Sequence, residues 1–254
     1  MGKIPVLLVD DHAVVRQGLR ILLEMEPDIE VVGEAENGRQ AVALACQYRP
    51  KVVIMDVAMP LLNGVEATRQ IGRQVAKSKV LVLTSYGDDN CVKQMMSAGA
   101  AGFLLKQTAA SELLKAVREV SRGNAFFSPL IAKRLRDQYR TAATSERSGP
   151  RPAGNELTPR EAEVLQLIAE GFANKQIAGE LGISIKTVEK HRQQVMNKLN
   201  IHDVAGLTRH AVFTGIIGRE MTNEIPDQDD TRSDNPALNP SGPEQDPTTP
   251  PTAG

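Results

Sequence analysis

Short apolar runs alternate with amphipathic segments over the first half of the chain. Segments whose apolar residues recur at helical spacing lie near 13–26, 38–48, 64–76, 89–98 and 111–122. The apolar runs have the length of buried strands and lie near 4–10, 29–35, 51–56, 79–84 and 102–106. Strict alternation with short connections predicts an α/β fold, with a five-stranded parallel sheet covered by helices on both faces.

The pattern changes after residue 123. A short helical pattern near 128–139 leads into a Ser-, Pro- and Gly-rich stretch that is typical of a flexible linker. The final stretch is rich in Pro, Asp, Asn and Thr and has few apolar residues, so we expect a disordered acidic tail. The predicted organisation is a domain over 1–123, a linker over 124–156, a second domain over 157–218 and a tail over 219–254.

The second domain has helical spacing throughout. Its helices are expected near 159–170, 174–181, 185–199 and 203–215. Thr158, Pro159 and Glu161 form a helix start, and Ser184 caps the third helix after a tight turn at Gly182. Two helices joined by a short turn that contains glycine predict a helix-turn-helix.

Charged residues follow three of the predicted strands. Asp10 and Asp11 end the first apolar run, Asp56 ends the third, and Lys106 ends the fifth. In the flavodoxin-like strand order 2-1-3-4-5, the switch point lies between strands 1 and 3, where Asp11 and Asp56 would meet. Three buried carboxylates need more positive charge than one lysine supplies, and Mg²⁺ is the hard cation that fits them.

Phosphoryl transfer is the chemistry that this set of groups favours. A metal and Lys106 would neutralise phosphoryl oxygens beside the Thr84 hydroxyl, and one carboxylate could attack phosphorus to give an acyl phosphate. A single aspartate at a strand end is usually a helix cap, but the whole set at matching strand ends is not explained in that way.

Residues 1–123 resemble the receiver domain of two-component response regulators, through the Asp-Asp pair, the D-x-x-x-P motif at Asp56, Thr84-Ser85 and Lys106. The resemblance implies that Asp56 accepts a phosphoryl group from a sensor histidine kinase. It also implies that Asp11, Asp56 and the carbonyl of Ala58 hold Mg²⁺ and that Asp10 assists. Thr84 and Lys106 would bind the phosphoryl oxygens.

Phe103 matches the aromatic switch position of receiver domains, where phosphorylation would move Thr84 and let the ring turn inward. Ordinary core packing is the alternative for this residue. Gln107 stands where many receivers have proline, so the geometry of that loop is open.

The third helix of the second domain carries a local positive charge. Lys186, Lys190, Arg192 and Lys198 outnumber Glu189, although the whole chain has a net charge of −1. A basic helix is often only a solvated surface, but here it follows a helix-turn-helix. The block therefore predicts local binding to nucleic acid.

This block resembles the LuxR-type DNA-binding domain in its motifs LTPRE, NKQIA and TVEKH. The resemblance implies that 185–199 is the recognition helix in the major groove of promoter DNA, with Lys186 on its outward side, and that 203–215 contacts a second copy. Closure of the domain's own core is the alternative for the last helix. Bases would be read by Glu189, Lys190 and Gln193, and phosphates would be bound by Lys175, Ser184, Thr187 and Lys198.

The sequence also indicates where the protein is located and the state of its cysteines. No signal peptide or membrane-length apolar stretch is evident, so we expect a cytoplasmic protein without a membrane partner. Cys46 and Cys91 have no metal-ligand spacing and are expected to be buried or half-buried thiols.

The sequence favours a transcription regulator of the NarL/FixJ class, with RNA polymerase as a further candidate partner. In this hypothesis the unphosphorylated domains dock and mask the recognition helix, and phosphorylation favours a homodimer on DNA. It is not expected to be an enzyme beyond Mg²⁺-dependent self-phosphorylation and slow autodephosphorylation. Two alternatives stay open: an orphan regulator that binds DNA constitutively, and a small-molecule enzyme on the same scaffold.

Overall fold

A six-stranded parallel sheet forms the centre of the N-terminal domain. The computed structural model describes residues 2–85, 89–129, 131–133, 136 and 157–217, so the predicted tail and most of the linker lie outside the described residues. Of the short helix predicted near 128–139, the described residues 129, 131–133 and 136 are helical. The strand order is β2-β1-β3-β4-β5-β6. The strands are β1 (Ile4–Val9), β2 (Ile29–Ala35), β3 (Val52–Met55), β4 (Lys79–Thr84), β5 (Gly102–Leu105) and β6 (Phe126–Phe127).

The sixth strand corrects the five-stranded prediction. β6 pairs in parallel with β5, and the Phe126 N–H donates to the carbonyl of Ala101. Two residues are too few to show an apolar run, which is why the pattern missed this strand. The sheet therefore continues past the predicted boundary at residue 123.

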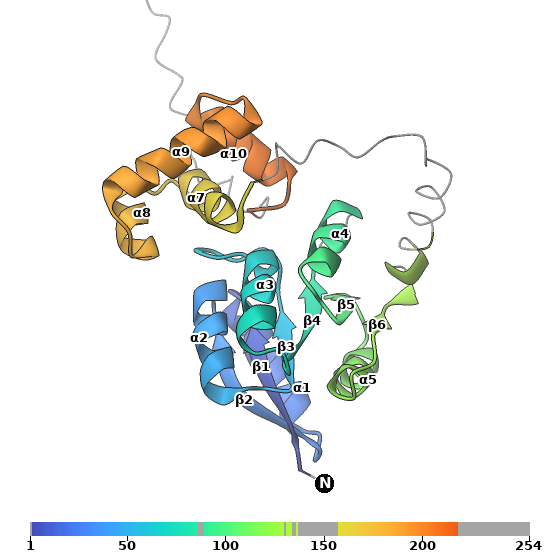
Figure 1. Cartoon of the computed structure of the whole chain (residues 1–254). Coiled ribbons are helices and arrows are strands. Elements are labelled where there is room, and N and C mark those ends of the chain that lie inside the picture. The colour runs from blue at the N-terminus through green and yellow to red at the C-terminus, as the bar shows by residue number, and fades with distance from the viewer. Residues whose placement is uncertain (1, 86–88, 130, 134–135, 137–156, 218–254) are drawn as a thin grey trace, which may run out of the picture. The chain divides into compact units, whose positions relative to one another are not determined.

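Five helices cover the two faces of the sheet (Figure 1). Leu8 and Ile54 point from the sheet into a cluster with Leu23 of α1 and Val117 of α5. The alternate strand residues pack against α2 and α3, and Phe103 packs against α4. The helices are α1 (Ala13–Glu24), α2 (Gly38–Tyr48), α3 (Gly64–Gln74), α4 (Asp89–Ser97) and α5 (Ala110–Ser121).

The second domain consists of helices around a small core. Its helices are α7 (Pro159–Ala169), α8 (Asn174–Leu181), α9 (Ile185–Leu199) and α10 (Val204–Phe213). Thr158 and Glu161 form the predicted capping box, and Gly182 ends α8 with φ of 61°. The core that joins the four helices includes Leu167, Ile177, Val188 and Leu207. The predicted helix-turn-helix is thus present.

Two further expectations can be compared with the structure. Within the described ranges, no helix has both the length and the apolar character needed to cross a bilayer. Neither of the two cysteines forms a disulfide, and Cys91 is half-buried as predicted. Cys46 is exposed, which contradicts the expectation of burial. It lies on α2, and its thiol contacts Gln74 Oε1 at the end of α3 at 3.1 Å.

Candidate functional site

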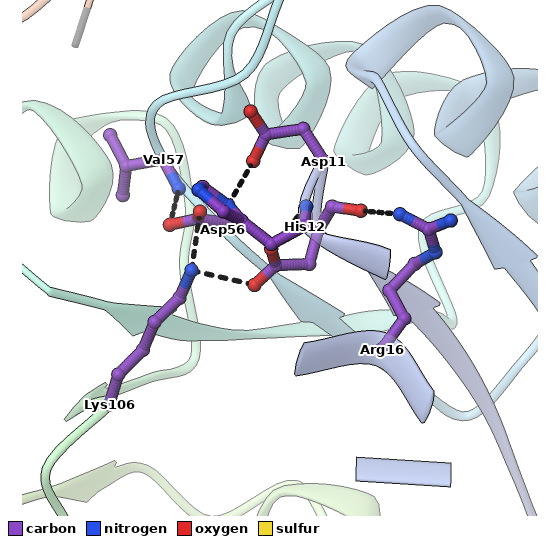
Figure 2. Close-up of polar contacts among 7 residues, drawn as sticks. Asp11, His12, Arg16, Asp56, Val57 and Lys106 are labelled. Atoms are coloured by element: carbon purple, nitrogen blue, oxygen red, sulfur yellow. Dashed lines mark hydrogen bonds and ion pairs between the residues drawn. The ribbon is translucent and has the colours of Figure 1, made fainter. Parts of the chain in front are cut away.

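The carboxyl ends of β1, β3 and β5 bring the predicted charged residues together. β1 lies beside β3, and Asp10 and Asp56 follow these two strands directly. Lys106 Nζ lies 2.7 Å from Asp10 Oδ2 and 2.8 Å from Asp56 Oδ2 (Figure 2). One ammonium group therefore bridges two nearly inaccessible carboxylates.

Asp56 is buried, and its two oxygens have different partners. Oδ1 accepts a hydrogen bond from the Val57 N–H at 2.7 Å, while Oδ2 faces Lys106. Burial raises the pKa of Asp56 to about 6, although the nearby Lys106 ammonium opposes this shift. Burial alone would lower the pKa of Lys106, but Asp56 and Asp10 more than offset it, so that pKa is raised. At neutral pH the Asp56 carboxylate is ionised, and Lys106 offsets only part of the cost of burying its negative charge. A buried carboxylate of this kind suits a nucleophile, because forming a bond through one oxygen removes the charge that is costly to bury.

His12 and Arg16 are neighbours of this cluster that the sequence reasoning did not single out. His12 Nδ1 lies 2.8 Å from Asp11 Oδ1 and 3.2 Å from Asp10 Oδ1, and Arg16 Nη1 donates to the Asp10 carbonyl at 2.6 Å (Figure 2). Burial would lower the pKa of His12, but the carboxylates of Asp11 and Asp10 raise it. A histidine directly after an Asp-Asp pair was the available signal.

The donor set fits a hard divalent cation. Asp10, Asp11, His12 and Asp56 offer ligand atoms that all lie within 4.8 Å of one another. Asp11 Oδ1 is buried, and the described group that it contacts is the His12 ring, which carries positive charge only when it is protonated. Carboxylate oxygens with this spacing are the ligands that Mg²⁺ prefers.

A glycine shapes the loop that follows Asp56. A Cβ at Gly64 would lie 2.0 Å from the carbonyl oxygen of Asp56, so no other residue fits without moving the backbone. The Gly64 N–H donates to the Val57 carbonyl at 2.8 Å, and Asn63 caps α3 through the Glu66 N–H. The start of α3 is therefore held directly against the carboxylate-bearing segment.

Thr84 and Phe103 lie on neighbouring strands of the same domain. Thr84 ends β4 and is buried, at the same edge of the sheet as Asp56. Phe103 on β5 is fully buried, in a cluster that includes Met95 and Ile131. In this conformation the ring of Phe103 already lies inward as part of the core.

The outward face of α9 presents polar side chains to solvent. Lys186, Glu189, Lys190 and Gln193 are all exposed, while Val188 is buried in the domain core. Ser184 caps the helix by accepting from the Thr187 N–H at 3.1 Å, and the two hydroxyls lie 2.8 Å apart. Lys175 on α8 is also exposed. Four of the residues predicted to face DNA thus share the accessible side of α9, and Lys175 adds an exposed cation on α8.

Lys198 differs from the other residues predicted to face DNA. Its Nζ lies 2.7 Å from Glu161 Oε2, and the Glu161 side chain is only 4% exposed. Burial would raise the pKa of Glu161, but hydrogen bonds from Lys198 and Thr158 lower it. Lys198 therefore compensates the buried charge of Glu161 within the domain. This structural role accounts for the lysine even if it does not contact a DNA phosphate.

The last helix divides its apolar residues between two roles. Leu207 and Ala211 are fully buried in the domain core, whereas Val204 is 45% and Phe213 is 85% exposed. α10 therefore closes the domain, as the alternative interpretation held. Only its exposed residues are free to contact a second molecule.

Two family descriptions match consecutive parts of the chain. Residues 6–118 match "Response regulator receiver domain", and residues 155–211 match "Bacterial regulatory proteins, luxR family". The first match contains the carboxylate cluster, and the second contains α9.

Known proteins resemble the chain over both matched regions. LiaR, a transcriptional regulatory protein of Bacillus subtilis (strain 168), is 43% identical over 210 residues, which cover 83% of this chain and 96% of LiaR. DegU of Brevibacillus brevis is 38% identical over 212 residues, covering 80% and 90% of the two chains. A structure of the Salmonella typhimurium response regulator RcsB is 27% identical with a TM-score of 0.57, covering 84% and 99%.

Proposed function

Because this chain belongs to the two-component response regulators with a LuxR-type DNA-binding domain, we propose that phosphorylation of Asp56 by a sensor histidine kinase controls its binding to promoter DNA. The observation that carries the proposal is the position of Asp56, a buried carboxylate whose Oδ2 lies 2.8 Å from Lys106 Nζ. The cytoplasmic location expected from the sequence forms part of the proposal, because promoter DNA is its ligand.

Asp56 is the proposed nucleophile. Its carboxylate oxygen forms a bond to phosphorus while the bond between phosphorus and the imidazole nitrogen of the kinase breaks, and that nitrogen takes up a proton. Lys106 stays close enough to bind a phosphoryl oxygen, and the Val57 N–H holds the other Asp56 oxygen at 2.7 Å. Thr84 is the proposed hydroxyl partner of the phosphoryl group.

Asp11 and Asp56 would hold Mg²⁺, with the Ala58 carbonyl and with Asp10 in support. When bound, the ion would neutralise charge on the phosphoryl oxygens. The support in this chain is the cluster of donor atoms, because Asp10, Asp11 and Asp56 offer carboxylate oxygens that lie within 4.8 Å of one another. His12 would have to leave its position 2.8 Å from Asp11 Oδ1 or share that oxygen with the ion.

DNA would be bound through the exposed side of α9. Glu189, Lys190 and Gln193 are the proposed base-reading residues, with Lys186 beside them and Lys175, Ser184 and Thr187 at phosphates. A solved structure entitled "Structure of two RcsB dimers bound to two parallel DNAs", 27% identical with a TM-score of 0.50, supports DNA as the ligand. Lys198 is omitted from the proposed contacts, because it pairs with Glu161.

The proposed output is a homodimer on paired half-sites, about 34–36 Å apart. On α10, Val204 and Phe213 are exposed apolar residues that a second copy could cover. The proposed resting state has the two domains docked so that α9 is hindered. RNA polymerase would then be contacted by the DNA-bound form.

Fluorescence anisotropy of the full chain would test the switch. The probe is a duplex selected from a random pool, titrated with and without acetyl phosphate and Mg²⁺. We expect phosphorylation to raise affinity by about 5- to 150-fold, the usual range for coupling between linked sites. The Asp56→Asn variant should not respond, and Asp28→Asn, an exposed aspartate beside Arg118, serves as the matched control.

Equal affinity in both states would refute the switch. If the Asp56→Asn variant also bound the duplex as well as the phosphorylated wild type does, the orphan regulator that binds DNA constitutively would replace it.

A further inference from the structure

A cleft lined by basic residues lies at the edge of the receiver sheet opposite Asp56. Lys51 precedes β3 and Lys79 begins β4, so both lie at the amino ends of strands whose carboxyl ends carry Asp56 and Thr84. Five residue steps along β3 separate Lys51 from Asp56, roughly 16 Å at about 3.3 Å per residue. The cleft is therefore distinct from the phosphorylation site.

Three connections that are distant in sequence form the cleft, which has a volume of about 590 Å³. They are 49–51 after α2, 74–79 after α3, and 121–123 after α5. The first two connections are tied together, because Ser78 Oγ donates to the Pro50 carbonyl at 2.6 Å and the Lys79 N–H donates to the Lys51 carbonyl at 3.0 Å. The walls are thus held by hydrogen bonds, of which the one from Ser78 is buried, although the charged side chains themselves are exposed.

The lining of the cleft is positively charged, and most of its cationic side chains have no carboxylate partner among the described residues. Five of its residues are cationic and none is acidic: Arg49, Lys51, Lys77, Lys79 and Arg122. Arg122 pairs with Glu119 outside the lining, whereas the other four make no ion pair with any described residue. Like charges gathered in one concave surface repel one another and focus a positive potential, and a bound anion would relieve the repulsion.

The chemistry of the lining indicates the class of ligand. Ammonium and guanidinium groups bind phosphate oxygens by charge-assisted hydrogen bonds, and several cations suit an anion with several phosphates. The volume lies within the usual range for small-molecule sites. No aromatic residue lines the cleft, so a nucleobase would find no ring to stack on. We propose that this cleft binds a small polyphosphate anion through its phosphates.

Isothermal titration of the full chain with sodium tripolyphosphate tests the proposal. EDTA is present, so that no metal-dependent chemistry at Asp56 contributes. The Lys51→Gln/Lys77→Gln variant should bind about tenfold more weakly or worse, a loss of about 1.4 kcal/mol. The control is Lys133→Gln/Arg136→Gln, which removes the same charge from two exposed residues outside the cleft.

Amide chemical-shift mapping locates the bound anion. Shifts confined to 49–51, 74–79 and 121–123 would support the cleft, and shifts confined to 185–199 would overturn it. Equal weakening in both double variants would also overturn it, because it would reveal only general charge attraction. Titration with ATP tests whether the cleft recognises more than the phosphate chain. An affinity equal to that of tripolyphosphate supports recognition of the phosphates alone. Clearly tighter binding of ATP would overturn the claim that the ligand is bound only through its phosphates.

Titration with non-specific duplex DNA tests whether the basic cleft is instead a DNA contact. If the Lys51→Gln/Lys77→Gln variant lost duplex binding and kept tripolyphosphate binding, the basic surface would be a DNA contact instead and the proposal would fail. Circular dichroism melts of each variant establish that it is folded before binding is compared.

Discussion

Replacing Asp56 with asparagine should stabilise the metal-free protein at neutral pH. The carboxyl is 5% exposed and its pKa is raised to about 6 from 3.8, mainly by burial. The folded state therefore holds this proton more tightly than the unfolded state does, so stability contributed by the neutral acid is lost as pH rises from about 4 to about 6. Asparagine keeps the shape of the neutral acid and cannot ionise.

The size of the effect follows from the shift. A rise of about two pKa units corresponds to about 3 kcal/mol at about 1.4 kcal/mol per unit, and this includes the compensation by Lys106. The free energy of unfolding of Asp56→Asn minus that of the wild type should be small near pH 4. It should rise to about 3 kcal/mol above pH 7.

Urea denaturation followed by circular dichroism, in EDTA from pH 4 to 8, measures this difference. Comparing variant and wild type at each pH removes the titration of all other groups. The Asp28→Asn control should not stabilise, because Arg118 lowers the pKa of that exposed carboxyl by hydrogen bonding. A difference that does not change with pH, or a destabilised variant at pH 7.5, would show that burial of the Asp56 charge is not costly.

Three other substitutions test the shape of the site and of the DNA-binding domain. Gly64→Ala should cost about 1–3 kcal/mol of stability, since its Cβ would meet the Asp56 carbonyl, and a thermal melt would detect this. Lys190→Gln should weaken binding to the selected duplex by about 1–3 kcal/mol without changing the melting temperature. Lys198→Gln should do the reverse, lowering stability by about 1–3 kcal/mol through loss of the Glu161 pair while leaving DNA affinity nearly intact. Weaker DNA binding by folded Lys198→Gln would return that residue to the phosphate contacts.

Most elements of both domains could be predicted from periodicity and turn residues. The apolar runs gave β1 to β5 within one or two residues, because strands buried on both faces are continuous apolar stretches. Local signals such as Thr158 with Glu161, and Ser184, placed the helix starts, because capping depends on neighbours three residues apart. β6 was missed, because a two-residue strand exists only through its partner β5.

Some features of the candidate sites could also be predicted from the sequence, and others could not. That Asp10, Asp56 and Lys106 meet follows from sequence, because parallel strands place their carboxyl ends at one edge. The position of His12 beside Asp11, the burial of Phe103 and the pairing of Lys198 with Glu161 did not follow from it. Each of these depends on side-chain directions across elements, which periodicity does not specify.

The sequence by itself determined which residues of this chain carry the chemistry, through strand ends, helix caps and the spacing of apolar positions. These are local or periodic properties, and they survive without knowledge of the packing. Only the tertiary structure decided how the charges are compensated: Lys106 serves two carboxylates, while the five cations of the basic cleft meet no acid in its lining. The physical reason is that burial and Coulomb interaction depend on distances between segments far apart in the chain.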